Sequence, residues 1–97
     1  MSLIRQGDVL LIPATEIPAH AKRVRRDNGR VVLAYGEATG HAHAILEDGV
    51  TLVSVEQAEE LRMWLKVETE EPVHLVHEEH ETLTVAPGLY EVRRQRE

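Results

Sequence analysis

Two histidines separated by a single residue, His41 and His43, are the clearest candidates for chemistry, and Glu47 follows on the same stretch. If residues 41 to 47 form a β-strand, side chains two apart point to the same face, with roughly 6.6 Å between their Cα atoms. His41 and His43 would then share one face of the strand, and Glu47 would continue it. Two imidazoles placed in this way could bind one ion.

A second pair of histidines, in His77-Glu-Glu-His80, lies downstream and could complete the set of ligands. The chain has no cysteine, so a transition-metal site must use imidazole, carboxylate and water. Zinc, nickel and iron are the divalent ions that such ligands favour. We therefore predict a metal site, and its candidate ligands are His41, His43, Glu47, His77 and His80.

The alternative interpretation is that these histidines are structural. Each inward-facing imidazole could be satisfied by a backbone carbonyl or by a neighbouring carboxylate. His20 lies in a loop next to Pro18, and His74 falls on the opposite face of its strand from His77, so neither is a candidate ligand. Catalysis would require an open coordination position, which a sequence does not reveal, and the question of an enzyme stays open.

Length and composition favour one small domain over residues 1–97, with an aliphatic core, because 42% of the residues are hydrophobic but none is Phe. No stretch has the length of a signal peptide or a membrane span, so a cytoplasmic protein is expected. The net charge of -6 argues against a nucleic-acid partner, whose binding depends on phosphate neutralisation. The basic residues between Lys22 and Arg30 are interpreted as part of a solvated face.

The clearest turn signal is Asn28-Gly29, which suits a type I′ turn because both central residues need a positive φ. It predicts a hairpin that pairs residues 22–26 with residues 31–35. Farther along, Ser54-Val-Glu-Gln57 has the form of a helix capping box and predicts a short helical turn over residues 56–61.

About eight short apolar or alternating segments, separated by turn residues, predict an all-β fold with at most one short helical turn. The expected architecture is a small antiparallel barrel or a sandwich. We favour the barrel at this point, since closure would remove the exposed strand edges of so short a chain.

Part of the central segment resembles the first motif of the cupin family, namely Gly36, the pair His41-Ala-His43, and Glu47. Cupins are β-barrels that hold a divalent metal on these residues together with a later histidine. The resemblance therefore implies a metal on His41, His43 and Glu47, with His77 in the place of the later ligand.

Over nearly its whole length the chain resembles a group of small uncharacterised bacterial and phage-encoded proteins. The shared pattern consists of Gly7-Asp-Val-Leu-Leu-Ile-Pro13, Gly36-Glu-Ala-Thr-Gly-His-Ala-His43, His77-Glu-Glu-His80, Pro87-Gly-Leu-Tyr90 and Gln95-Arg-Glu97. This resemblance implies that the segments belong to one family, but it implies no activity.

Two functions thus compete. The first is binding of a divalent transition metal by the histidine groups. The second is a non-catalytic interaction module, of the kind a phage-associated accessory protein would provide, whose histidines are structural. A protein partner or a second copy of the chain would then be held by charged faces or by Trp64. Alternation over residues 61–68 places Trp64 on the polar side of its strand, where it could contact such a partner, but packing at a rim is the favoured interpretation.

Overall fold

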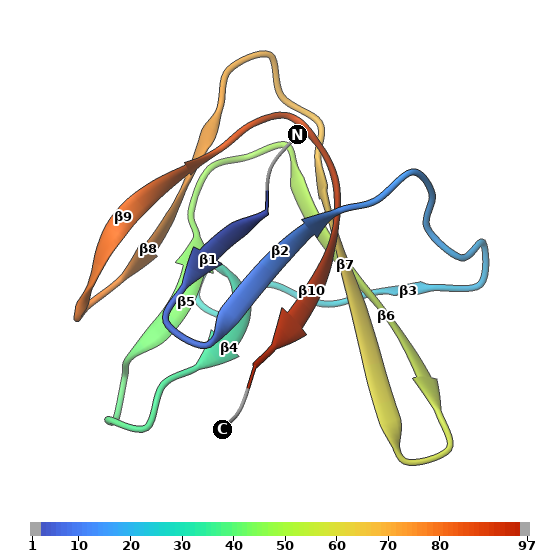
Figure 1. Cartoon of the computed structure of the whole chain (residues 1–97), viewed down its shortest axis with the longest axis horizontal. Coiled ribbons are helices and arrows are strands. Elements are labelled where there is room, and N and C mark those ends of the chain that lie inside the picture. The colour runs from blue at the N-terminus through green and yellow to red at the C-terminus, as the bar shows by residue number, and fades with distance from the viewer. Residues whose placement is uncertain (1–2, 96–97) are drawn as a thin grey trace.

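The computed structural model describes residues 3–95, which form ten strands and no helix (Figure 1). One antiparallel sheet has six strands, in the order β1 (Ile4–Gln6), β2 (Val9–Pro13), β10 (Gly88–Arg94), β7 (Glu60–Val67), β6 (Val50–Gln57) and β3 (Lys22–Arg23). The other antiparallel sheet has four strands, in the order β4 (Val31–Tyr35), β5 (Ala42–Ile45), β8 (Val73–His77) and β9 (His80–Val85). The all-β class predicted from the sequence is confirmed.

An aliphatic core fills the space between the two sheets. Strand β2 shows the expected alternation, since Val9 and Leu11 are fully buried while Leu10 is only partly buried. Full burial of such a side chain stabilises the fold by roughly 1.5–3 kcal/mol. Tyr90 is the largest fully buried residue, and its hydroxyl donates a hydrogen bond to the Ala86 carbonyl oxygen at 2.6 Å.

The sheets form a sandwich, and the expectation of a closed barrel is wrong. Strands β1 and β3 lie at the edges of one sheet, and β4 and β9 lie at the edges of the other. The edges of the six-stranded sheet are protected by their shortness, because β1 has three residues and β3 has two. In addition, the side-chain amide of Gln6 on β1 donates to the Glu81 carbonyl oxygen of β9 at 3.0 Å, which joins the two sheets.

The predicted hairpin of residues 22–26 with 31–35 is also wrong, although its turn exists. Asn28 and Gly29 have φ values of 53° and 77°, and the flanking residues Asp27 and Arg30 exchange backbone hydrogen bonds. Beyond that bridge the two arms separate, because β3 pairs with β6 whereas β4 pairs with β5. The apolar side chains of β4 are buried in the core, whereas the charged residues of β3 are exposed. Burial therefore does not hold β3 beside β4.

Strands β6 and β7 continue into one long hairpin where the capping box predicted a helical turn. The pairing runs to Gln57 opposite Glu60, and Ala58 takes a positive φ of 56° in the turn. Trp64 on β7 is only 5% exposed, because it packs with Val53 and Val55 under the loop that carries Ile17. Trp64 thus lies on the face of β7 opposite the main core, as the alternation predicted, and it is packed there rather than exposed.

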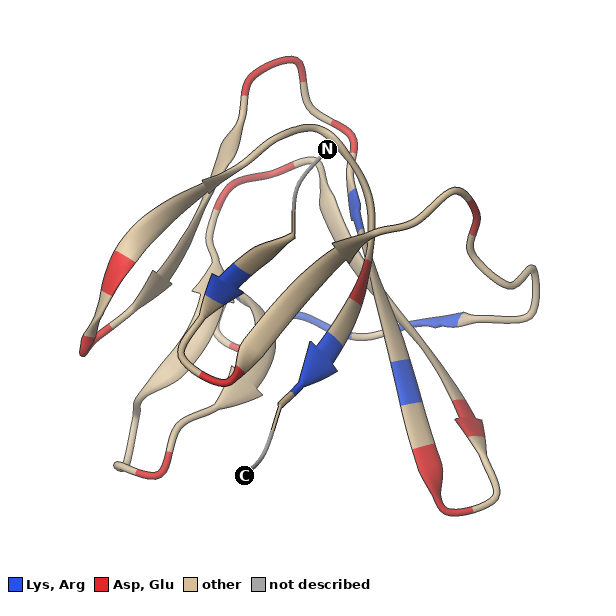
Figure 2. Ribbon diagram, in the orientation of Figure 1, with Lys and Arg blue, Asp and Glu red and all other residues tan. Residues whose placement is uncertain are grey.

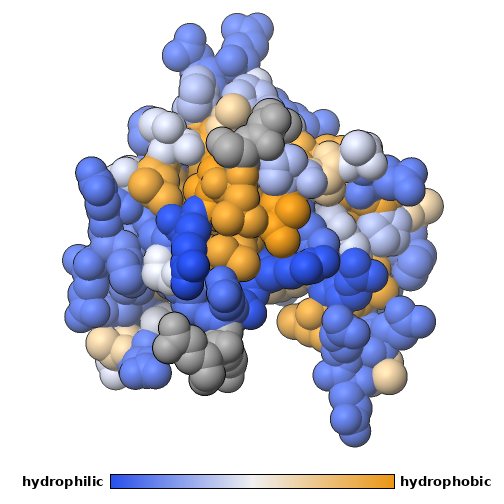
Figure 3. Space-filling model, in the orientation of Figure 1, coloured by the Kyte–Doolittle hydropathy of each residue, from blue (hydrophilic) through white to orange (hydrophobic). Residues whose placement is uncertain are grey.

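Basic residues occur on β1, β3, β7 and β10, and acidic residues occupy many of the turns (Figure 2). Arg26 has a structural role, since its guanidinium donates to backbone carbonyl oxygens, among them those of Gly29 at 2.8 Å and Glu47 at 2.7 Å. On the face seen in Figure 3, apolar side chains gather over β1 and β2, and hydrophilic atoms surround them. The described part of the chain contains no helix that is long and apolar enough to cross a membrane.

The turn at Gly29 provides a test of this account of the fold. We expect Gly29→Val to lower the free energy of unfolding by about 1–2 kcal/mol, because a β-branched residue is strained at positive φ. A Cβ at this position would meet no atom within 4 Å, so a clash cannot cause the loss. Urea unfolding measures the change, and Gly29→Asn is the control because Asn tolerates positive φ. Equal midpoints for Gly29→Val and the unsubstituted protein would contradict the turn.

Candidate metal centre

Three histidines from three strands meet where the β8–β9 hairpin turns beside β5. His43 lies on β5, His77 is the last residue of β8, and His80 is the first residue of β9. The ring centroids are 4.3 Å apart for His43 and His77, 4.6 Å for His77 and His80, and 5.7 Å for His43 and His80. One ring nitrogen of each residue lies within 4.8 Å of the other two. We call these three residues the histidine cluster.

Local irregularities in the four-stranded sheet aim these side chains. The register shifts between Val32 and Ala34 on β4, opposite His43, and again between Leu75 and His77 on β8. Such shifts bend a strand and redirect the side chains beside them. The turn is also tied to β5, because a Glu78 carboxylate oxygen accepts the Ala42 N–H at 2.9 Å, and this bond lowers the pKa of Glu78.

A buried hydrogen bond orients His43. The Gln6 amide nitrogen donates to the carbonyl oxygens of Leu75 and Glu81, both at 3.0 Å, so its amide oxygen must face Nδ1 of His43 at 2.8 Å. That oxygen can only accept, and Nδ1 of His43 therefore carries a proton. In the neutral ring the lone pair is then on Nε2, which is the arrangement of a histidine prepared to ligate a metal.

His43 is neutral at physiological pH as well as oriented. Burial, followed by the proximity of His77, lowers the pKa of His43 from 6.5 to about 4. A metal ion that binds His43 at neutral pH would thus have no proton to displace from Nε2.

Asp8, in the turn between β1 and β2, places a carboxylate beside the histidine cluster. Its Oδ1 is 3.6 Å from Nε2 of His43, while Oδ2 accepts hydrogen bonds from Arg94 at 2.9 and 3.2 Å. Burial alone would raise the pKa of Asp8, but the hydrogen bonds and the charge of Arg94 outweigh it and the pKa is lowered. The site therefore includes a charged carboxylate that Arg94 holds in place.

Two glycines allow the backbone to approach the imidazole rings closely. A Cβ on Gly7 would lie 2.8 Å from Nε2 of His80, and a Cβ on Gly36 would lie 3.0 Å from Cβ of His41 and 3.3 Å from Nε2 of His77. Gly7 also has a φ of 56°, which favours glycine on conformational grounds. Any side chain at Gly7 would displace the ring of His80.

His77 is held in a particular tautomer. Its Nδ1 accepts the backbone N–H of Glu79 at 3.0 Å, so a neutral ring carries its proton on Nε2. Ligation through Nε2 would move that proton to Nδ1, and the Glu79 N–H would then need another acceptor. The turn between His77 and His80 is thus the part of the site that must adjust when a metal binds.

The structure does not bring all five predicted ligands together. His41 lies at the rim, with its ring centroid 5.9 Å from that of His77 and its Nδ1 3.6 Å from a Glu79 carboxylate oxygen. Glu47 lies elsewhere, since its carboxylate accepts hydrogen bonds from the backbone and ring of His74, the latter at 2.6 Å. The glutamate that the cupin-like motif would make a ligand is therefore engaged with an exposed histidine outside the histidine cluster.

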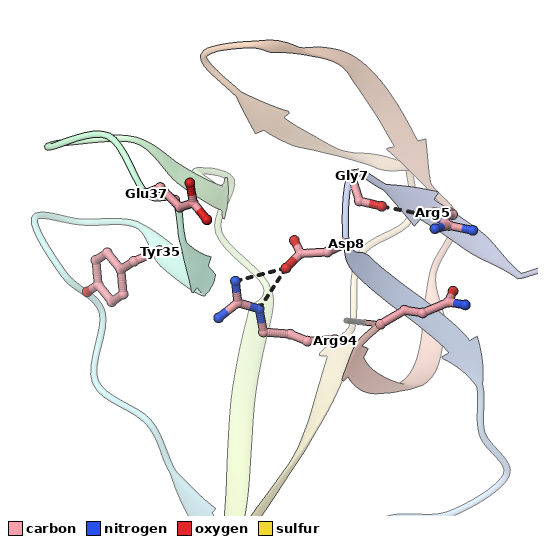
Figure 4. Close-up of a pocket in the computed structure, with 8 residues that line it drawn as sticks. Arg5, Gly7, Asp8, Tyr35, Glu37 and Arg94 are labelled. Carbon is pink, nitrogen blue, oxygen red and sulfur yellow. Dashed lines mark hydrogen bonds and ion pairs between the residues drawn. The ribbon is translucent and has the colours of Figure 1, made fainter. Parts of the chain in front are cut away.

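An open cleft of about 440 Å³ lies in front of the histidine cluster. Its walls come from both sheets, with Asp8 and Arg94 on one side and Tyr35 and Glu37 on the other. A hollow of about 670 Å³ adjoins it and shares these four residues. Figure 4 shows the Asp8 carboxylate extending toward the Arg94 guanidinium, with Tyr35 at the end of β4 and Glu37 in the loop that follows it.

Fold and site together define a small two-sheet β-domain with a histidine cluster beside an open cleft. The chain belongs to the DUF8820 family, a domain of unknown function, whose family model matches residues 5–95. This agrees with the expectation of one uncharacterised family over most of the length. Comparison with curated proteins and comparison with solved structures each return no match.

Sequence reasoning missed the three residues that support the histidine cluster from the six-stranded sheet, namely Gln6, Asp8 and Arg94. Gly7 and Asp8 were noted only as part of the shared family pattern, and nothing in the sequence shows that they face His43. Arg94 is one of several basic residues near the end of the chain, and only the pairing of β10 with β2 brings it to Asp8. Gln6 has no local signal, since its partners are on strands far along the chain.

The lowered pKa of His43 predicts how the stability of the metal-free protein depends on pH. An unfolded chain takes up a proton near pH 6.5, whereas folded His43 resists protonation until about pH 4. The unfolded state therefore binds more protons between these values, and the free energy of unfolding falls as the pH decreases through this window. From about pH 7 to about pH 5 the expected loss is about 2 kcal/mol, measured by urea unfolding.

Matched variants separate this effect from general acid sensitivity. His43→Gln should remove most of the loss between these two pH values, whereas His20→Gln, at an exposed position, should retain it. Equal pH dependence in the two variants would contradict the assignment to His43.

Proposed function

We propose that this domain binds a divalent transition metal through His43, His77 and His80. The observation that carries the proposal is the convergence of three imidazoles from three strands, with one nitrogen of each within 4.8 Å of the others. A zinc ion binds imidazole nitrogen at about 2.0–2.1 Å. Small side-chain rotations would draw the three nitrogens around such an ion. Zinc, nickel and iron suit these ligands better than magnesium does.

The support around the cluster favours ligation over a purely structural role. Gln6 fixes the proton of His43 on Nδ1 and so leaves Nε2 free to ligate, and Gly7 and Gly36 place no side chain against the nitrogens of His80 and His77. Burial and the neighbouring imidazoles oppose protonation of His43, so its Nε2 gains no stabilisation from a proton. A bound ion would give the Nε2 lone pair of His43 a partner.

Metal binding is tested by calorimetric titration of the metal-stripped protein with zinc, nickel and iron(II). We expect saturable binding, a raised melting temperature and an affinity that weakens as the pH is lowered, because a protonated imidazole cannot ligate a metal. His43→Ala, His77→Ala and His80→Ala should each weaken binding by more than about 10-fold, since loss of a ligand should cost at least as much as loss of a residue that orients one.

The strand β8 offers a matched control. His74 is exposed and lies three residues before His77, outside the histidine cluster, so His74→Ala should leave the affinity unchanged. His41→Ala should have a smaller effect than His43→Ala, because His41 lies at the rim. Glu47→Gln should have none. No heat and no thermal shift with any of these ions would assign the histidines a structural role and favour the interaction module.

A further inference from the structure

We propose that the cleft in front of the histidine cluster takes a small organic monocarboxylate, which ligates the bound metal and accepts a hydrogen bond from Arg94. This inference rests on the proposed metal site and names the class of ligand that completes it.

The first step is the charge of the centre. Imidazoles are neutral when they bind a metal, so three of them leave both positive charges of the ion uncompensated. Within residues 3–95, no carboxylate joins the three histidines in a set of mutually close donor atoms. Asp8 places Oδ1 3.6 Å from Nε2 of His43, and Arg94 already pairs with its other oxygen. Three imidazoles would leave a coordination position of the ion open, and an anion from solution that fills it would offset part of the charge.

The second step is access. The cleft of about 440 Å³ reaches His43, His77 and His80, and it opens toward the adjoining hollow. Gly7 and Gly36 line both spaces and project no side chain into them. A small ligand can thus reach the ion from the side that the protein leaves uncovered.

The third step is the hydrogen-bond donor. Arg94 uses Nε and Nη2 to hold Asp8, and within the described residues Nη1 has no acceptor. A guanidinium beside a metal is well suited to a carboxylate, which can place one oxygen on the ion and the other on an N–H group.

The charges at the rim restrict the class of anion. Glu37 and Glu79 line the same cleft, and their carboxylates would repel a doubly charged phosphate more strongly than a singly charged carboxylate. Asp8 adds a third negative charge, which Arg94 offsets. These charges therefore favour a monocarboxylate over a doubly charged oxyanion.

Cobalt(II) provides the test as a spectroscopic probe, because its visible absorption changes with the ligands and their number. Titration of the cobalt-loaded protein with acetate should produce a saturable spectral change, and perchlorate at the same ionic strength should produce none. Arg94→Gln should weaken acetate binding about tenfold, the effect expected for a lost hydrogen bond to a charged group. Arg93→Gln is the matched control, since the adjacent Arg93 pairs with Glu91 and lies outside the cleft.

The outcomes are separable. If cobalt binds but acetate leaves the spectrum unchanged, the carboxylate inference is overturned while the metal site stands. Equal weakening in the Arg94 and Arg93 variants would attribute the effect to net charge and would contradict a direct role for Arg94. Failure of the protein to bind cobalt would overturn both proposals together. Inorganic phosphate, titrated in parallel, should bind more weakly than acetate, and the reverse order would contradict the assigned class.

Discussion

The hydrogen bond between Gln6 and His43 is the interaction on which the site depends. It is buried between the two sheets, and the same amide also donates to the backbone of β8 and β9. Removal of the Gln6 side chain would leave Nδ1 of His43 and the two carbonyl oxygens without this partner, and an unsatisfied buried polar group costs about 1–3 kcal/mol. One side chain thus holds the edge strand β1 against β9 and fixes the tautomer of His43 that leaves Nε2 free to ligate.

The sandwich then determines what the histidine cluster can reach. All three imidazoles come from the four-stranded sheet, whereas Asp8, Gly7 and Arg94 come from the facing sheet. The cleft lies where strand ends of the two sheets meet, since His77 ends β8, His80 begins β9 and Arg94 ends β10. A bound metal would therefore have protein ligands on one side and an open face on the other.

Much of the fold class followed from local patterns, and much of the topology did not. The strand predicted from alternation over residues 61–68 and the positive-φ turn at Asn28-Gly29 depend on neighbours in sequence, and the strand and the turn are both present. Strand pairing depends on partners that are distant in sequence. For that reason β3 pairs with β6, although β4 is the strand that follows it in the chain. The capping box at Ser54 was overridden because β6 and β7 continue to pair through it.

The candidate site was likewise predictable only where it depends on residue type and local sequence. His43, His77 and His80 were recognisable because their residue type limits what they can do, and two of them bracket one turn. Glu47 was expected to continue the face of His43, but β5 ends at Ile45 and the chain turns before Glu47 is reached. The orienting residues Gln6, Asp8 and Arg94 could not be assigned, since their roles arise only from strand pairing across the whole chain.

X-ray absorption spectroscopy of the zinc-loaded protein tests the central claim most directly, because it counts the ligands around the ion. The account predicts three imidazole nitrogens at about 2.0–2.1 Å, with the outer-shell scattering typical of histidine rings, and one or more light oxygen ligands. His77→Ala should reduce the imidazole count by one, and His74→Ala should leave it unchanged. A zinc ion surrounded mainly by oxygen, or an imidazole count that does not respond to His77→Ala, would contradict the account.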